Sequence, residues 1–164
     1  MRGFSLFELT LVVLIVGIIG AIVIPTVGNG SASSRLSAAA NVLASDIEFC
    51  ASECITHPSD TRAIAFDLAN NKYTVENFGT GATIAHPADT FPFVNDFSTG
   101  RNSQFQGVTL SRIVVGSGTM TTLTFDAYGR PVITADMAIT LAYHWATMTV
   151  TVQKGTGEVT ITAP

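Results

Sequence analysis

Charged side chains are scarce in this sequence of 164 residues: they make up 12% of it, against about 25% in a typical globular domain. Acidic residues outnumber basic ones, 12 to 8, for a net charge of −4. That balance argues against a broad basic surface that would bind nucleic acid through its phosphates. The composition also excludes collagen, coiled coils and charge-rich disordered chains, and the length fits one ordinary domain.

Common catalytic motifs are missing as well. The sequence has no nucleophile elbow, no glycine-rich loop of the kind that cradles phosphate and no His-Glu-x-x-His zinc motif. Its three histidines, His57, His86 and His144, occur in separate contexts. We therefore predict neither an enzyme nor a bound cofactor, and we assign no metal ligands.

Hydrophobic residues nevertheless reach 47%, and the excess is concentrated near the N-terminus. Residues 9–24 read LTLVVLIVGIIGAIVI, and the apolar run counted from Phe4 spans 21 residues before Pro25. At about 1.5 Å per residue such a helix matches a hydrocarbon core of about 30 Å. The run is too long for a secretory signal, and residues 25–30 offer no Ala-x-Ala cleavage site. We predict a membrane-spanning helix over residues 4–24, with Arg2 favouring a cytoplasmic N-terminus.

One carboxylate, Glu8, interrupts this run. An ionisable group inside a spanning helix costs about 2.5 to 3.5 kcal/mol on insertion scales, so such a residue normally has a function and a partner. No basic side chain lies within one helical turn of Glu8 to neutralise it. We therefore expect its partner to come from another molecule.

The residues around Glu8 resemble a known signal. Residues 3–9, GFSLFEL, followed by the apolar run and Pro25, are similar to the class III signal of type IV pilins and type II secretion pseudopilins. The resemblance implies that prepilin peptidase removes residues 1–3 by cutting after Gly3 and methylates the new amine of Phe4. It further implies that Glu8 pairs with the N-terminal amine of a neighbouring subunit in a helical filament, a pairing that makes a buried charge tolerable. Loss of Arg2 changes the net charge from −4 to −5.

Residues 25–57 form a linker and the amphipathic half of the helix. Gly28 and Gly30 follow Pro25 within a small, polar stretch that weakens a helix, and we predict a bend or local unwinding there. Beyond it, apolar residues recur in steps of three and four and predict one face that packs on a sheet. Those positions are Leu36, Ala40, Leu43, Ile47, Cys50 and Cys54. Pro58 predicts the end of the helix near His57.

Residues 58–164 carry strand signals and form a predicted β-rich head. Alternating patterns and glycine-containing turns predict strands over 62–68, 72–76, 108–115, 120–125, 137–143, 147–153 and 158–162. Asn70 and Asn71 mark a hairpin turn between the first two strands. The long segment 79–107, which contains four phenylalanines, predicts an irregular excursion with a short strand or two, partly packed on the head. The fold class is therefore α+β, a long helix on an antiparallel sheet.

A second resemblance involves most of the chain. Residues 35–43, residues 53–55 and the stretch LTFDAYGRP at 123–131 are similar to the GspH/FimT type of minor pseudopilin, as is the final pattern over 150–161. Within the stretch 123–131 we expect Phe125 to lie in the core and Asp126 and Gly129 to form a turn.

The resemblance implies a structural subunit of a type II secretion system or a type IV pilus machine, and several partners. These are prepilin peptidase, other major and minor pilin-like subunits, an inner-membrane assembly platform and membrane lipid. The protein would be a single-pass protein of the bacterial inner membrane with a periplasmic head. Two alternatives are a FimT-like subunit that binds DNA for uptake and a membrane-tethered periplasmic binding module. Lys154 is the lone cation near the last hairpin, which disfavours DNA, and a simple anchor has no use for Glu8.

The two cysteines, Cys50 and Cys54, lie four residues apart on the predicted packed face. Three interpretations remain open: small residues that fill the core, a disulfide in an oxidising compartment, or metal and redox chemistry with His57 nearby. Helical spacing of four residues suits disulfide geometry poorly.

Overall fold

The computed structural model describes the backbone of residues 6–163, and the side chains of this range except those of residues 6–9, 15–31, 100 and 101. Helix α1 runs from Leu6 to Thr56. The chain divides between Ser34 and Arg35 into two compact units. The second unit contains the end of α1 and all the strands, and it forms the head.

The helix assignment continues without interruption through Pro25, Gly28 and Gly30. The chain is thus helical at these residues, and the local unwinding expected there is not observed. A bend at the same residues stays a prediction. Among the described residues, no helical stretch combines the length and apolar character that a membrane crossing requires. The predicted span, residues 4–24, falls mostly on residues whose backbone or side chains lie outside that description.

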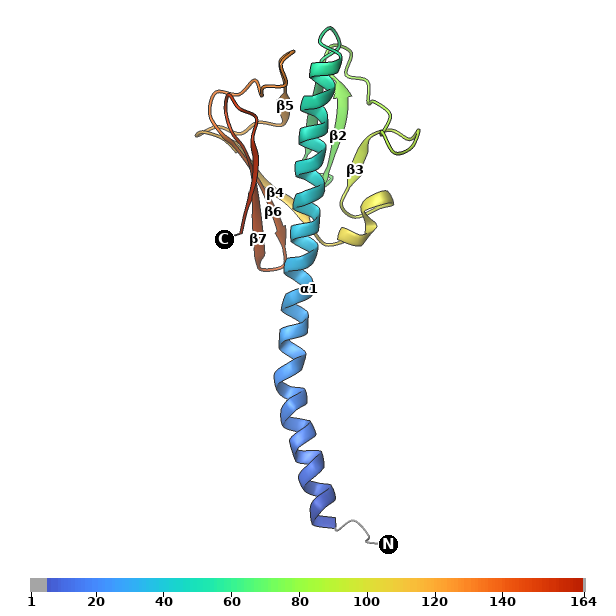
Figure 1. Ribbon diagram of the computed structural model, residues 1–164, viewed down its shortest axis with the longest axis vertical. Helices are drawn as coiled ribbons and strands as arrows, with labels where there is room; N and C mark the ends of the chain where they lie inside the picture. The colour runs from blue at the N-terminus through green and yellow to red at the C-terminus, as the bar shows by residue number, and fades with distance from the viewer. Residues whose placement is uncertain (1–5, 164) are drawn as a thin grey trace. The chain divides into compact units, whose positions relative to one another are not determined.

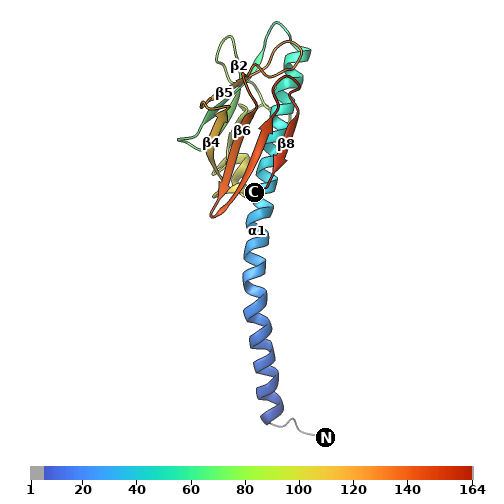
Figure 2. The same ribbon diagram turned by 90° about the vertical axis from the view of Figure 1, so that its left-hand side faces the viewer.

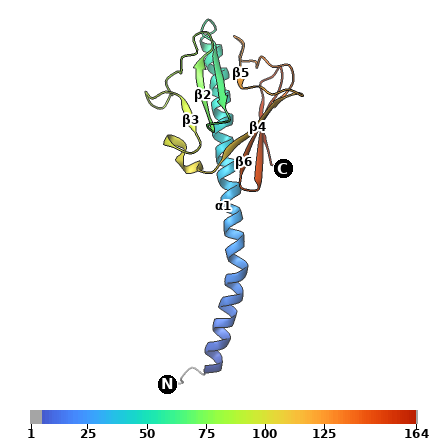
Figure 3. The same cartoon turned by 180° about the vertical axis from the view of Figure 1, so that it is seen from behind.

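Within the head, α1 buries the face that its spacing predicts. All six positions are at most 1% exposed: Leu36, Ala40, Leu43, Ile47, Cys50 and Cys54. The opposite positions Asn41, Ser45 and Glu48 are exposed. Each fully buried leucine or isoleucine contributes about 1.5 to 3 kcal/mol relative to an exposed one. In Figure 1 this part of α1 lies in front of the strands and in Figure 3 behind them, so the helix covers one side of the head.

Helix α1 ends at Thr56, one residue before the predicted limit. The Thr56 hydroxyl donates to the carbonyls of Ser52 and Glu53, at 3.0 and 3.1 Å. The His57 N–H also donates to the Glu53 carbonyl, at 2.8 Å. These bonds satisfy carbonyls that a helix end leaves without intrahelical partners, and the proline at position 58 prevents a further turn.

The described part of the head contains two antiparallel sheets. The first has the order β3-β2-β1-β5 and the second the order β4-β6-β7-β8. The elements are β1 (Arg62–Asp67), β2 (Lys72–Asn77), β3 (Val94–Asp96), the 3-10 helix η1 (Gly100–Phe105), β4 (Thr109–Val115), β5 (Thr122–Thr124), β6 (Met137–Tyr143), β7 (Ala146–Val152) and β8 (Val159–Thr162). Figure 2 shows the second sheet, with β8 beside α1. The α+β class with a long helix packed on antiparallel strands is therefore confirmed, and the strands form two sheets where one was expected.

The β1–β2 hairpin has the predicted turn. Asn71 adopts a left-handed conformation with φ of 55°, which asparagine tolerates better than most residues. The Asp67 side chain accepts a hydrogen bond from the Asn70 N–H at 3.0 Å. The register pairs Phe66 with Tyr73 and thereby places both rings in the core.

The excursion over residues 79–107 supplies core side chains, as expected. It forms β3 and η1, and three of its four phenylalanines, Phe93, Phe97 and Phe105, are at most 5% exposed. Phe91 is 70% exposed. The buried rings join the side chains of α1 and both sheets in one hydrophobic cluster.

Candidate functional site

The predicted processing and assembly residues lie at the N-terminus. Gly3 and Phe4 are outside the described residues. Glu8 lies in α1, and its side chain is likewise outside the description. The roles predicted for these three residues stay predictions.

Four consecutive apolar side chains in the first unit are exposed in the isolated chain. Leu11, Val12, Val13 and Leu14 have exposed fractions of 47%, 51%, 64% and 62%. Consecutive helical residues point in directions about 100° apart, so four of them present apolar surface around the whole helix. Water is an unfavourable surrounding for such a helix, which is normally covered by lipid or by other helices.

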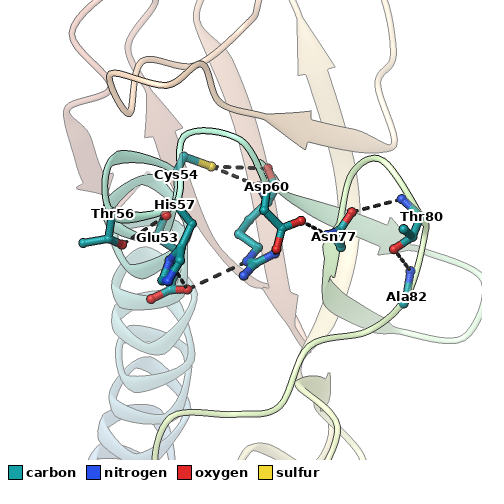
Figure 4. Close-up of polar contacts among 9 residues, drawn as sticks. Glu53, Cys54, Thr56, His57, Asp60, Asn77, Thr80 and Ala82 are labelled. Carbon is teal, nitrogen blue, oxygen red and sulfur yellow. Dashed lines mark hydrogen bonds and ion pairs between the residues drawn. The ribbon is translucent and has the colours of Figure 1, made fainter.

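A group of polar side chains surrounds the end of α1 in the head, and Figure 4 shows it. We call it the helix-end cluster; it consists of Glu53, Cys54, His57, Asp60, Arg62 and Asn77. Arg62 is 9% exposed. Its Nη1 donates to Asp60 Oδ2 at 2.6 Å, and its Nε lies 3.8 Å from Glu53 Oε2. In the described part of the chain, this Nε is the one buried side-chain N or O atom without a hydrogen bond.

The same cluster connects α1 to both strands of the first hairpin. His57 Nδ1 lies 3.4 Å from Glu53 Oε2, and Asn77 Nδ2 donates to Asp60 Oδ1. A buried arginine next to two carboxylates is a stable arrangement because its charge is compensated. The cluster therefore fixes the helix end against β1 and β2.

Cys50 and Cys54 are free thiols and both are completely buried. The Cys54 sulfur accepts a hydrogen bond from the Arg62 backbone N–H at 3.1 Å. The Cys50 thiol donates a hydrogen bond to the Cys54 sulfur. This bond, the Arg62 N–H and the Arg62 guanidinium lower the pKa of Cys54 from 9.0 to about 7, and burial opposes them. That hydrogen bond, together with burial, raises the pKa of Cys50. The face predicted for these cysteines is thus confirmed, and the predicted disulfide alternative is untested.

A polar network that no sequence pattern predicts joins α1 to β2, β3 and η1. Tyr73 Oη donates to Asp46 Oδ2 at 2.6 Å, and Asn95 Nδ2 donates to the same carboxylate. Asn102 Nδ2 donates to Asn95 Oδ1 at 3.0 Å. Burial and the negative charge of Asp46 raise the pKa of Tyr73 well above 10.0. Because each of these bonds crosses between elements, the network fixes the helix in register with the first sheet.

The turn predicted in the stretch 123–131 is present and contacts α1. Asp126 Oδ1 accepts the backbone N–H groups of Tyr128 and Arg130, both at 2.9 Å. Hydrogen bonds from the Arg130 backbone and side chain lower the pKa of Asp126. Gly129 has φ of +73°, and an added Cβ there would lie 2.8 Å from Ile55 Cδ1. Phe125 is 2% exposed, so its predicted place in the core is confirmed.

A cavity of about 250 Å³ opens beside the end of β4. Its lining is mainly apolar and includes Val115, Met120, Val132 and Ile133. The volume is below the range of about 300 to 1,000 Å³ that is typical of small-molecule sites, and its lining contains no titratable side chain.

Grouped metal ligands are also absent from the part of the chain that the structure describes: no three His, Cys, Asp or Glu side chains lie close enough to hold an ion together. His144 is exposed, with φ of 52° in the β6–β7 turn, and His86 stacks edge-on against Phe93 at 4.3 Å between ring centroids. Lys154 donates its Nζ to the Thr134 carbonyl at 2.8 Å.

Solved structures with a similar fold exist. The type IV minor pilin FimU of Pseudomonas aeruginosa matches with a TM-score of 0.57 and 17% identity, over 80% of this chain and 94% of that one. The minor pseudopilin EpsH from the type 2 secretion system of Vibrio cholerae matches with a TM-score of 0.56 and 12% identity, over 79% of this chain and 98% of that one. A second crystal form of FimU gives a TM-score of 0.54. At this identity the likeness establishes a pilin-like fold.

No protein-family model matches the sequence, and no curated protein matches it either.

Proposed function

We propose that this protein is a minor pilin or pseudopilin of the GspH/FimT type, a structural subunit of a type II secretion system or a type IV pilus machine. The observation that carries the proposal is the pilin-like fold, a long N-terminal helix with antiparallel sheets on one side of its second half. The pilin-like signal at residues 3–9 supports it independently of the fold.

In the proposed mechanism the first part of α1 acts through association. Prepilin peptidase cuts after Gly3 and methylates Phe4, and Glu8 then pairs with the N-terminal amine of a neighbouring subunit. The apolar surface at Leu11–Leu14 supports this, because a helix that is apolar on all sides needs lipid before assembly and other helices afterwards. Pro25, Gly28 and Gly30 would allow the helix to bend as it leaves the membrane.

The head provides a rigid surface for contacts with other pilin-like subunits and an inner-membrane assembly platform. Two separate sets of contacts, the helix-end cluster and the Asp46–Tyr73 network, support this role because they join α1 to the first sheet at two levels. The protein would be inserted in the bacterial inner membrane with its head in the periplasm. It would act by assembly, without catalysis.

Binding of nucleic acid is not part of the proposal. The processed chain would have a net charge of −5, and Lys154, the cation near the last hairpin, is hydrogen-bonded to the Thr134 carbonyl. Affinity for a duplex depends on the number of phosphates that basic side chains neutralise.

The test is the mass of the chain purified from its own cells. We expect a mature protein that begins at monomethylated Phe4 and that fractionates with sheared pili or with cross-linked pseudopilus subunits. The variant Gly3→Val should retain residues 1–3 and remain in the membrane fraction. A wild-type chain that retains Met1, or that is cut elsewhere, would contradict the proposal.

A further inference from the structure

We infer that Cys50 and Cys54 together form a buried binding site for one soft monovalent cation of the Cu(I) class. The two thiols lie on the same face of α1 and are joined by a side-chain hydrogen bond, and both are completely buried. Thiolates are the protein ligands that select soft ions such as Cu(I). The inference concerns the head and is independent of filament assembly.

The helical spacing favours an ion over a disulfide. Side chains at positions i and i+4 hold their Cβ atoms about 5 to 6 Å apart, whereas a disulfide requires about 3.5 to 4.5 Å. Closing a disulfide between Cys50 and Cys54 would therefore distort α1, which is regular at both residues. Two metal–thiolate bonds of about 2.3 Å each, the length known for zinc, span about 4.6 Å between the sulfurs. An ion held linearly between the two sulfurs thus fits the undistorted helix.

The coordination number favours a monovalent soft ion over zinc. A structural zinc site needs four ligands in tetrahedral geometry. Within the described residues no third Cys, His, Asp or Glu completes a metal-binding group with this pair. His57 and Glu53 are engaged with each other at 3.4 Å, and His57 is exposed. Two sulfurs without further ligands suit an ion that accepts two-coordination.

A buried cation lies next to the proposed complex. Binding converts two thiols and one Cu(I) ion into a complex of two thiolates with one ion and releases two protons, so the complex has a net charge of −1. The Arg62 guanidinium favours the thiolate form of both sulfurs, and the Glu53 carboxylate opposes it. The Nε of Arg62 is buried without a hydrogen bond, so the complex would lie next to a cation that it shares with Asp60 and Glu53.

A short exposed segment lies next to the site. Residues 57–59 are exposed and directly follow the last turn of α1. They precede Arg62, whose backbone N–H covers the Cys54 sulfur. Opening of this short loop, together with Arg62 at the start of β1, would expose the Cys54 sulfur.

The experiment is an anaerobic titration of the detergent-solubilised full-length protein against the coloured Cu(I) complex of bicinchoninate. We expect one Cu(I) per chain to be withdrawn from the chelator. Cys50→Ala and Cys54→Ser should each weaken binding by roughly 100-fold or more, because each removes one of two ligands. Met120→Leu, which removes a sulfur outside the pair, should leave the affinity unchanged.

X-ray absorption of the copper-loaded wild type keeps the test decisive if a cysteine variant fails to fold. Two sulfur neighbours without nitrogen or oxygen neighbours would support the site. Stoichiometry far below one, a first shell dominated by nitrogen or oxygen, or equal loss of affinity in Met120→Leu would overturn it.

Discussion

The Tyr73 hydroxyl of β2 lies 2.6 Å from Asp46 Oδ2 of α1, and it donates its proton to that carboxylate. Asn95 of β3 donates to the same oxygen and to the Tyr73 oxygen. Asp46 is half-buried, so its carboxylate loses part of its hydration and these donors replace it. The contact therefore fixes both the helix position and the protonation state of the tyrosine.

Replacing Tyr73 with phenylalanine should destabilise the head by about 1 to 3 kcal/mol at pH 7, because Asp46 loses a donor while the ring remains. Urea unfolding of the full-length chain, followed by near-ultraviolet circular dichroism, measures the effect. Tyr128→Phe is the matched control, since Tyr128 is 76% exposed; it should change stability by less than about 0.5 kcal/mol. Equal effects of the two variants would show that the hydroxyl of Tyr73 contributes nothing.

The raised pKa of Tyr73 predicts loss of stability at alkaline pH. Above pH 10 the tyrosine ionises in the unfolded chain but stays protonated in the folded one. The unfolded state then binds fewer protons, so the free energy of unfolding falls as pH rises. Tyr73→Phe should reduce this fall, and an unchanged pH profile in the variant would contradict the assignment.

Gly129 should tolerate alanine much less well than Gly155. Both glycines have positive φ, +73° and +87°, so the backbone strain is similar. At Gly129 the new Cβ would also lie 2.8 Å from Ile55 Cδ1 and 3.0 Å from the Ala51 carbonyl, whereas nothing lies within 4 Å at Gly155. We expect Gly155→Ala to cost about 1 kcal/mol and Gly129→Ala at least about 1 kcal/mol more. Equal melting temperatures would show that the turn does not rest on α1.

The lowered pKa of Cys54 predicts that stability rises between pH 7 and pH 9. In this window the folded chain holds Cys54 as a thiolate, while the unfolded chain still binds the proton because its pKa is near 9.0. The contribution is lost as pH falls through 7. Above pH 9 the raised pKa of Cys50 reverses the slope.

Cys50→Ala should flatten this rise, since it removes the donor that stabilises the Cys54 thiolate. Urea unfolding at several pH values, with the ultraviolet absorbance of the thiolate as a second readout, compares wild type and variant. The assignment would be refuted if the difference in stability between the wild type and Cys50→Ala stayed constant or decreased from pH 7 to pH 9.

Local patterns predicted the parts of the fold that depend on neighbouring residues. The core face of α1 follows from steps of three and four residues, and the β1–β2 hairpin follows from alternation around Asn70 and Asn71. The turn at Asp126 was predictable for the same reason, because its hydrogen bonds join residues up to four apart.

Features made by distant residues could not be predicted in this way. The division into two sheets arises because β5 pairs with β1 while β4 pairs with β6, and a strand's own alternation does not name its partner. The Asp46–Tyr73–Asn95 network joins three elements whose polar residues look ordinary in the sequence.

We propose that this chain is a filament subunit whose assembly requires the Glu8 carboxylate. The most direct measurement is the amount of Glu8→Ala protein in the sheared or cross-linked filament fraction of its own cells, relative to the membrane pool. We predict normal processing to Phe4 and membrane insertion but at least roughly tenfold less assembled protein, because the N-terminal amine of a neighbour loses its buried partner. Glu48→Ala, which removes an exposed carboxylate in the head, should assemble normally. Wild-type levels of assembled Glu8→Ala protein would contradict the account.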